Sequence, residues 1–228
     1  MSDKPVDCRP EAYVLFREQL PLLETLDGLW RSAAAVALHA IEDLSLEDVD
    51  QRLEALAERV RAGSRSGRDV ARVTYLHEVL FEEEGFCGDF ERYSSPLNSY
   101  LPVVLESRRG LPILLALVYK VVGERVGLRV EGIHSPGHFL ARVAVDGQWM
   151  IVDPFFHGQV LTRDEALARL SQLTGHSYFG QDDVLQTATH RQWIARILAN
   201  LQNSFATAGR QNDLSAMSEL QELLWASA

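Results

Sequence analysis

A long apolar segment followed by short alternating segments constrains the fold of this chain more than any other feature. Residues 111–127 read LPILLALVYKVVGERVG and are typical of a core helix, with Pro112 near the first turn, where its missing N–H costs nothing. Three predicted strands follow, at residues 129–132, 138–145 and 148–152. Asp146-Gly147 is a two-residue hairpin signal between the last two. The pattern therefore predicts one apolar helix followed by three short strands.

Amphipathic segments on both sides of this core predict further helices. The clearest spans residues 45–63, where apolar residues recur at helical spacing and Ser45 begins a motif similar to a capping box. The segment 11–44 is also expected to be helical, with interruptions at Pro21 and Gly28. Other helices are expected at residues 69–86, 97–108 and 162–173.

Two apolar faces near the C-terminus predict a helical hairpin. One face carries Trp193, Ile197, Leu201 and Phe205, and its partner carries Leu214, Met217, Leu220 and Leu224. The hairpin resembles a single tetratricopeptide-type unit. Because a solenoid needs about 3 stacked repeats, we expect the hairpin to pack on the main domain rather than to form an independent peptide-binding array. The expected regions are an N-terminal helical region (1–90), a core (91–180) and this hairpin (187–228).

The charge and the cysteine content argue against several classes of protein. A net charge of −10 disfavours non-specific nucleic-acid binding, which depends on neutralising phosphates, and a basic membrane-surface helix. No apolar run reaches the ~20 residues that span a bilayer, and the first residues lack the apolar core of a secretory signal. Cys8 and Cys87 are too few for a disulfide scaffold, so a reducing cytoplasm is expected. No residue spacing indicates structural zinc, and neither a metal nor a cofactor is expected.

Four segments between residues 76 and 161 carry a family resemblance. They read LHEVLFEEEGFCGDFERYSSPLNSYL, VLESRRGLPILLALVYKVVGERVGL, VEGIHSPGHFLARV and VDPFFHG. In this order and spacing, they resemble the bacterial SirB-type, transglutaminase-like family. The resemblance implies an α+β fold with a papain/transglutaminase-like core over residues 91–180. In that core a helix packs on a small antiparallel sheet, and N- and C-terminal helices wrap it. Family members often carry tetratricopeptide-like helices at the C-terminus, which agrees with the predicted hairpin.

The resemblance also implies a catalytic plan with one part missing. In a thiol amidase or a transglutaminase, a cysteine thiolate attacks an amide carbonyl, a histidine moves the proton, and a carboxylate orients the histidine. This plan assigns the base to His138 and the orienting group to Asp153. The cysteine that opens the helix corresponds to Pro112, which has no nucleophilic atom. The sequence therefore predicts a His–Asp pair without its usual nucleophile.

Three substitutes for the missing nucleophile stay open. Cys87 lies in an expected loop, residues 87–96, although a free cysteine is more often a packing residue and the acidic neighbours Glu82 to Glu84 and Asp89 would raise its pKa. A serine hydroxyl is the second substitute, but serines are common in loops for turn and cap reasons. A metal ion is the third. The serines are Ser94, Ser95, Ser99 and Ser135, and the metal-ligating candidates are His134, His138, Asp153 and His157.

Residues around the expected helix start form a predicted groove for a substrate or partner. Arg108 and Arg109 can clamp a carboxylate or phosphate beside the histidine, or they can complement the dipole of the helix that they end. Gly137 is expected to supply an unusual backbone angle before His138. The predicted groove residues are Asn98, Arg108, Arg109, Gly110, Pro112 and Gly137.

The missing nucleophile favours a non-catalytic or repurposed regulatory module that binds a protein or peptide. The alternative is a hydrolase or acyl transferase that acts on amide bonds with His138, Asp153 and a displaced nucleophile such as Cys87. The sequence predicts no nucleic-acid partner and no membrane partner.

Overall fold

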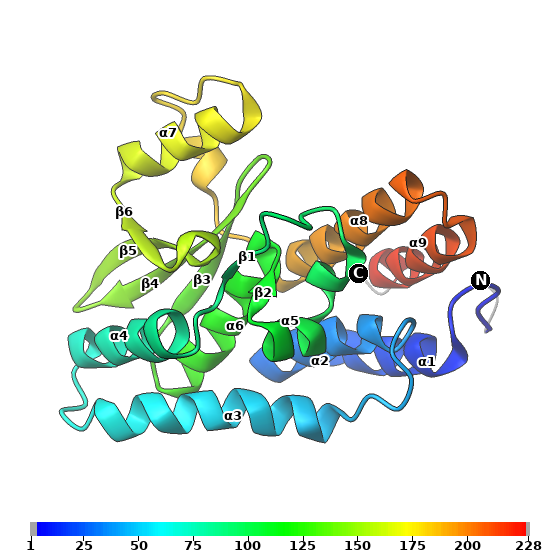
Figure 1. Ribbon diagram of the computed structural model, residues 1–228, viewed down its shortest axis with the longest axis horizontal. Helices are drawn as coiled ribbons and strands as arrows, with labels where there is room; N and C mark the ends of the chain where they lie inside the picture. Colours follow the sequence, from blue (N-terminus) through cyan, green and yellow to red (C-terminus); the bar gives the residue numbers. More distant parts are fainter. Residues whose placement is uncertain (1–3, 227–228) are drawn as a thin grey trace.

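The computed structural model describes residues 4–226 as helices around a small antiparallel sheet (Figure 1), which confirms the predicted α+β fold. No helix in this part of the chain has the length and hydrophobicity needed to cross a membrane. The α-helices are α1 (Pro10–Gln19), α2 (Leu26–Ala37), α3 (Leu46–Gly63), α4 (Asp69–His77), α5 (Leu101–Ser107), α6 (Pro112–Arg125), α7 (Arg163–Thr174), α8 (His190–Thr207) and α9 (Gln211–Ala226). The strands are β1 (Cys87–Gly88), β2 (Arg109–Gly110), β3 (Val130–His134), β4 (Phe139–Val145), β5 (Gln148–Asp153) and β6 (Gln159–Leu161).

The main sheet is an antiparallel meander in the order β3-β4-β5-β6. The three predicted strands are confirmed to within one or two residues at their ends. Asp146 and Gly147 have φ values of 48° and 83°, and the predicted two-residue turn needs positive φ at both positions. β6 was not predicted, because three residues are too few for a periodic pattern.

The predicted apolar helix is α6, which packs between the sheet and the N-terminal helices. It starts at Pro112 after the N-cap residue Leu111, and nearly all of its residues are buried. It contacts β3 and β4, and also α3 and α4. Lys120 is tolerated in this apolar environment because its Nζ donates a hydrogen bond of 2.7 Å to the carbonyl oxygen of Val130 and pairs with Glu124.

The N-terminal helices follow the sequence pattern with one correction. The side chain of Ser45 accepts a hydrogen bond from the backbone N–H of Asp48 and caps α3 as predicted. The predicted interruption at Pro21 is correct, because a 3-10 turn separates α1 from α2 there. The interruption predicted at Gly28 is wrong. This residue lies in the first turn of α2, where a Cβ would come within 1.9 Å of the carbonyl oxygen of Leu22, so the glycine serves close packing.

The helix predicted over residues 69–86 is present but changes its winding. α4 continues as a π-helix (Glu78–Glu83), and the segment turns at Gly85, which has a φ of 70°. The π-helix places the Phe81 ring where a Cβ on Gly158 would lie, at 2.1 Å. This contact places the chain segment that leads to Cys87 next to the loop that follows β5.

A short parallel strand pair replaces part of the expected 87–96 loop. β1 pairs with β2, which aligns Cys87 with Arg109 and Gly88 with Gly110. Strands of two residues leave no periodic signal in a sequence. The helix predicted over residues 97–108 is split into a 3-10 turn (Pro96–Ser99) and α5, because Pro102 is tolerated only in the first turn of an α-helix.

The predicted C-terminal hairpin is present as α8 and α9, and it belongs to the main core. The buried Trp193 donates a hydrogen bond of 3.2 Å from Nε1 to the carbonyl oxygen of Ile113, and its ring centroid lies 4.7 Å from that of Phe139. A Cβ on Gly132 would come within 2.4 Å of the indole, so the glycine lets α8 approach the sheet. One continuous set of buried apolar residues joins the N-terminal helices, α6, the sheet and the hairpin. The division into three regions stays a prediction.

Candidate functional site

A buried histidine–aspartate pair lies where β4 begins and β5 ends. His138 directly precedes β4, and Asp153 is the last residue of the neighbouring β5. Nε2 of His138 lies 3.0 Å from each carboxylate oxygen of Asp153. The exposed fraction is 3% for His138 and 0% for Asp153, so water has little access to either group.

Asp153 has other partners besides the histidine. The Nη1 group of Arg169, from α7, donates a hydrogen bond of 2.9 Å to Oδ2 of Asp153, and the backbone N–H of Phe155 donates one of 3.2 Å to Oδ1. A buried carboxylate needs such a compensating charge. The Arg169 guanidinium also lies 4.1 Å above the Phe156 ring. Arg169 was not predicted, because it occupies a helix position with no feature that marks a contact with β5.

Aromatic rings cover the histidine. The Phe155 ring centroid lies 5.8 Å from that of His138, and the Phe156 centroid lies 6.1 Å away. Phe155 also packs on Gly88, where a Cβ would come within 2.3 Å of the ring. Phe90 contacts Phe155 at 4.8 Å between centroids and extends the cover to the surface. Phe155 and Phe156 thus cover the His–Asp pair between β1 and α7.

The residue that the family resemblance assigns to the nucleophile position, Pro112, is buried. Pro112 is the first residue of α6 and offers neither a thiol nor a hydroxyl group. The second ring nitrogen of His138, Nδ1, makes no hydrogen bond with any residue from 4 to 226. In a thiol enzyme this nitrogen would face the nucleophile, since Nε2 is engaged by the carboxylate.

Cys87 lies in β1 and does not form a pair with the histidine. Among the described residues, its Sγ makes no hydrogen bond with His138, and its backbone N–H binds the carbonyl oxygen of Arg108 at 3.0 Å. The pKa of the Cys87 thiol is raised overall. Burial is the largest cause and Asp89 adds to it, while Arg109 acts in the opposite direction. Of the acidic neighbours expected to act on the thiol, only Asp89 does so. The thiol is therefore protonated at neutral pH.

None of the candidate serines forms a hydrogen bond with the histidine among the described residues. Ser135 and Ser99 are fully buried, and neither hydroxyl has a hydrogen-bond partner. The Ser95 hydroxyl accepts a hydrogen bond of 3.4 Å from the backbone N–H of Leu97, as expected for a turn residue. Ser94 is exposed and lines a cavity beside the start of α6.

The candidate metal ligands are dispersed. Nε2 of His134 lies 3.2 Å from Nη1 of Arg196, and burial together with this arginine lowers the pKa of His134. His157 is exposed in the left-handed conformation that follows the 3-10 turn after β5. Residues 4–226 contain no group of three or more histidine, cysteine, aspartate or glutamate side chains arranged to hold a metal ion.

Of the predicted groove residues, Asn98 lies near the start of α6, whereas Arg108 and Arg109 bind the end of the π-helix segment. Asn98 is buried near the start of α6, where its Nδ2 donates a hydrogen bond of 2.6 Å to the carbonyl oxygen of Arg92. Arg108 donates from Nε to Glu84 at 2.6 Å, and Arg109 donates from Nη1 to the carbonyl oxygen of Gly85 at 2.7 Å. The two arginines are thus bound to residues at the end of the π-helix segment and not to the His–Asp pair.

The two glycines of the predicted groove have different packing reasons. A Cβ on Gly110 would come within 2.8 Å of the Val104 side chain, so this position needs a small residue. Gly137 has a φ of 67°, which only glycine adopts at little cost, and a Cβ there would come within 2.6 Å of Thr174.

A cavity of about 170 Å³ lies beside the start of α6. Its walls carry amide and hydroxyl groups and no formal charge. Tyr93 in this wall also contacts Phe155, at 5.9 Å between ring centroids, so the cavity adjoins the aromatic cover of the histidine. The lining residues are Tyr93, Ser94, Leu111, Asn200, Asn203, Ser204 and Thr207. The α8 residues were not predicted, because they are far from α6 in the sequence.

Comparison with known proteins supports the relationship that the motifs indicate. The sequence model of the transglutaminase-like superfamily matches residues 47–199. A UPF0162 protein of Xylella fastidiosa is 32% identical over 199 residues, which cover 85% of this chain and 68% of that protein. A UPF0162 protein of Pseudomonas aeruginosa is 30% identical over 203 residues, with 86% and 69% covered. Human F-box only protein 21 is 23% identical over 190 residues, with 71% and 29% covered. No solved structure matches the chain.

Proposed function

Because the chain belongs to the transglutaminase-like superfamily but carries Pro112 at the position that the family resemblance assigns to the nucleophile, we propose that it is a non-catalytic module that binds a protein segment. Pro112 is the observation that carries this proposal. Every thiol-dependent acyl transfer begins with attack by a sulfur atom, and a pyrrolidine ring cannot replace it.

The buried His–Asp pair has a structural role in this proposal. A buried imidazole needs a hydrogen-bond partner, and Asp153 supplies it. Asp153 in turn binds Arg169, so the network joins β4, β5 and α7. The alternative is an amide hydrolase or acyl transferase that uses Cys87. That alternative needs the Cys87 thiol to ionise beside His138.

The partner is proposed to bind over the aromatic cover and the neighbouring uncharged cavity. Phe90, Tyr93 and Leu97 are 57%, 47% and 48% exposed, and exposed aromatic side chains with a polar rim are typical of protein-binding surfaces. The amide and hydroxyl groups of the cavity suit the backbone or an amide side chain of a peptide.

Three finer assignments are part of the same proposal. The motifs RRGLPI, PGHFL and DPF support a SirB-type protein within the superfamily. The antiparallel pair α8–α9 supports a tetratricopeptide-like unit that packs on the core. Two unpaired buried cysteines, Cys8 and Cys87, support a reducing, cytoplasmic location.

The proposed absence of thiol chemistry predicts that Cys87 reacts with iodoacetamide as an ordinary protonated thiol. We expect the alkylation rate to rise about 100-fold from pH 6 to pH 8, because the thiolate fraction grows tenfold per pH unit below the pKa. His138→Ala is expected to leave this profile unchanged. Peptide mapping separates Cys87 from Cys8, which serves as the unreactive internal reference. The pKa of Cys8 is raised to about 12, mainly by burial and also by Glu219. A fast, flat profile at pH 6 that disappears in His138→Ala would support the thiol-enzyme alternative.

The binding surface is tested with peptides selected from a random display library on the wild-type protein. We expect Tyr93→Ser and Phe90→Ser each to weaken the selected peptides by about 10-fold or more, because aromatic anchors dominate such interfaces. Phe179→Ser is the matched control, since Phe179 is 86% exposed in the segment after α7. Equal binding by Tyr93→Ser, Phe90→Ser and the wild type would reject this surface.

A further inference from the structure

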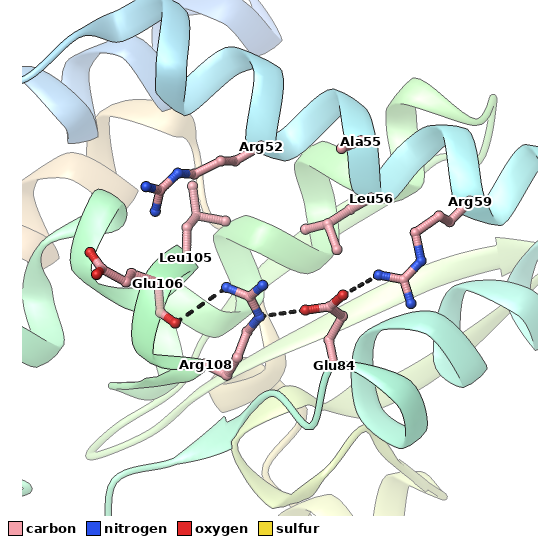
Figure 2. Close-up of a pocket in the computed structure, with 8 residues that line it drawn as sticks. All are labelled: Arg52, Ala55, Leu56, Arg59, Glu84, Leu105, Glu106 and Arg108. Carbon is pink, nitrogen blue, oxygen red and sulfur yellow. Dashed lines mark hydrogen bonds and ion pairs between the residues drawn. The ribbon is translucent and has the colours of Figure 1, made fainter.

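A second cavity, between α3 and α5, has a chemistry different from the site above. Its volume is about 280 Å³, and no residue of the His–Asp pair or its aromatic cover lines it. Figure 2 shows Arg52 and Arg59 projecting into this space from α3 and Arg108 projecting from the segment after α5. The buried side chains of Leu56 and Leu105 form its apolar part.

One carboxylate holds two of these arginines in place. Glu84 binds Nε of Arg108 at 2.6 Å and also binds Nη1 of Arg59. Burial opposes ionisation of Glu84, but the hydrogen bonds from Arg59 and Arg108 outweigh it and lower its pKa. The ionised carboxylate of Glu84 thus fixes the guanidinium groups of Arg59 and Arg108.

Two of the three guanidinium groups keep hydrogen-bond donors that are not in use among the described residues. Arg52 makes no hydrogen bond or ion pair with any residue from 4 to 226. Arg108 uses Nε and Nη1 for Glu84 and the carbonyl oxygen of Glu106, which leaves its Nη2 group uncommitted. Arg59, by contrast, is bound by both Glu84 and Glu83, so the free donors belong to Arg52 and Arg108. Such an arrangement favours an oxyanion, which guanidinium groups bind through paired hydrogen bonds.

The cavity continues into a neighbouring one that limits the class of ligand. A space of about 180 Å³ shares Arg52 and Glu106 with the first cavity, and it has apolar walls from residues such as Ile41 and Val103. Acidic side chains also line it: Glu42, Asp43 and Asp48. These charges repel a polyanion such as a nucleic acid more strongly than a segment with a single anionic group.

From this arrangement, we propose that the groove between α3 and α5 binds an extended segment of a partner protein. Arg52 and Arg108 hold one carboxylate or phosphate group of the segment, and the adjoining apolar part accepts its neighbouring side chains. This site is separate from the surface of Phe90 and Tyr93 and does not depend on it.

The anion contact is tested with inorganic phosphate, followed by NMR of the arginine side-chain Nε–H resonances. We expect saturable shifts at Arg52 and Arg108 at about 10 mM phosphate or below, and an affinity at least ~5-fold lower in Arg52→Gln. Arg65→Gln, just beyond the other end of α3, is the matched control, because Arg65 is exposed and has no side-chain partner among the described residues. Shifts that do not saturate, or equal affinity in Arg52→Gln, would overturn the anion site.

The protein segment is tested with displayed peptide pools that contain one fixed aspartate or one fixed phosphoserine. We expect at least one pool to yield peptides that phosphate displaces and that bind Arg52→Gln about 10-fold more weakly or worse. The pool that succeeds identifies carboxylate or phosphate as the source. The same peptides are expected to bind Tyr93→Ser normally, which distinguishes this groove from the proposed aromatic surface. Failure of both pools would reject a protein segment as the ligand.

Discussion

Asp153→Ala is expected to lower the free energy of unfolding by about 3–5 kcal/mol, measured by urea denaturation at neutral pH. The carboxylate is fully buried and accepts hydrogen bonds from His138, from Arg169 and from the backbone N–H of Phe155. Its removal leaves the Arg169 guanidinium without its buried partner and the imidazole without an acceptor.

The control for this prediction is Asp164→Ala in the first turn of α7. The Asp164 carboxylate is 79% exposed and pairs with Arg163 at 3.0 Å, so its loss should change stability by less than about 1 kcal/mol. A double-mutant cycle with Arg169→Met isolates the Asp153–Arg169 coupling, which we expect to be positive. If Asp153→Ala is as stable as the wild type, the buried network does not support the fold, and a structural reason for keeping the pair is lost.

Acidification is expected to destabilise the protein by about 2–3 kcal/mol through His77 alone. Burial lowers the pKa of His77 from 6.5 to about 4, and Nε2 of this residue lies 2.9 Å from the hydroxyl of the buried Tyr119. Because the folded-state pKa is the lower one, the unfolded chain takes up a proton first as the pH falls. The stabilising contribution is therefore complete above pH 6.5 and is lost between pH 6.5 and pH 4.

The measurement is the urea midpoint of the wild type and of His77→Gln across this pH range. Glutamine keeps a hydrogen-bonding group near Tyr119 and does not titrate, so the stability of this variant should depend less on pH. His176→Gln is the control, since His176 is exposed after α7 and its loss should leave the wild-type slope unchanged. Equal slopes in His77→Gln and the wild type would show that His77 does not cause the acid sensitivity.

The elements with strong periodicity were predictable from sequence. α3, the three longer strands and the α8–α9 pair each carry a run of residues long enough to show a period, whereas α6 is marked by its long apolar run. β1, β2 and β6 are too short to do so, and the break near Tyr100 depends on where Pro102 falls in the helix. Gly28 was misread as an interruption, because its close contact with Leu22 exists only once the chain is folded.

The candidate site was predictable only where its parts lie on adjacent strands. His138 and Asp153 are fifteen residues apart in a hairpin, and the turn between the strands sets their approach. Arg169 reaches Asp153 from α7, and Asn200 and Asn203 reach the start of α6 from α8. Such contacts depend on how helices dock, and no local pattern encodes docking. The cavity of Arg52, Glu84 and Arg108 likewise needs three separate segments to meet.

The sequence by itself determined that Pro112 supplies no nucleophile, because its side chain has no thiol or hydroxyl group whatever the fold. It also determined the order of the core helix and strands, since hydrophobic period follows directly from residue order. The tertiary structure decided what surrounds the remaining pair. Only the packing of β1, α7 and the turn after β5 places Phe155, Phe156 and Arg169 on His138 and Asp153. Burial and charge compensation are properties of neighbours in space, so they arise only when distant segments come together.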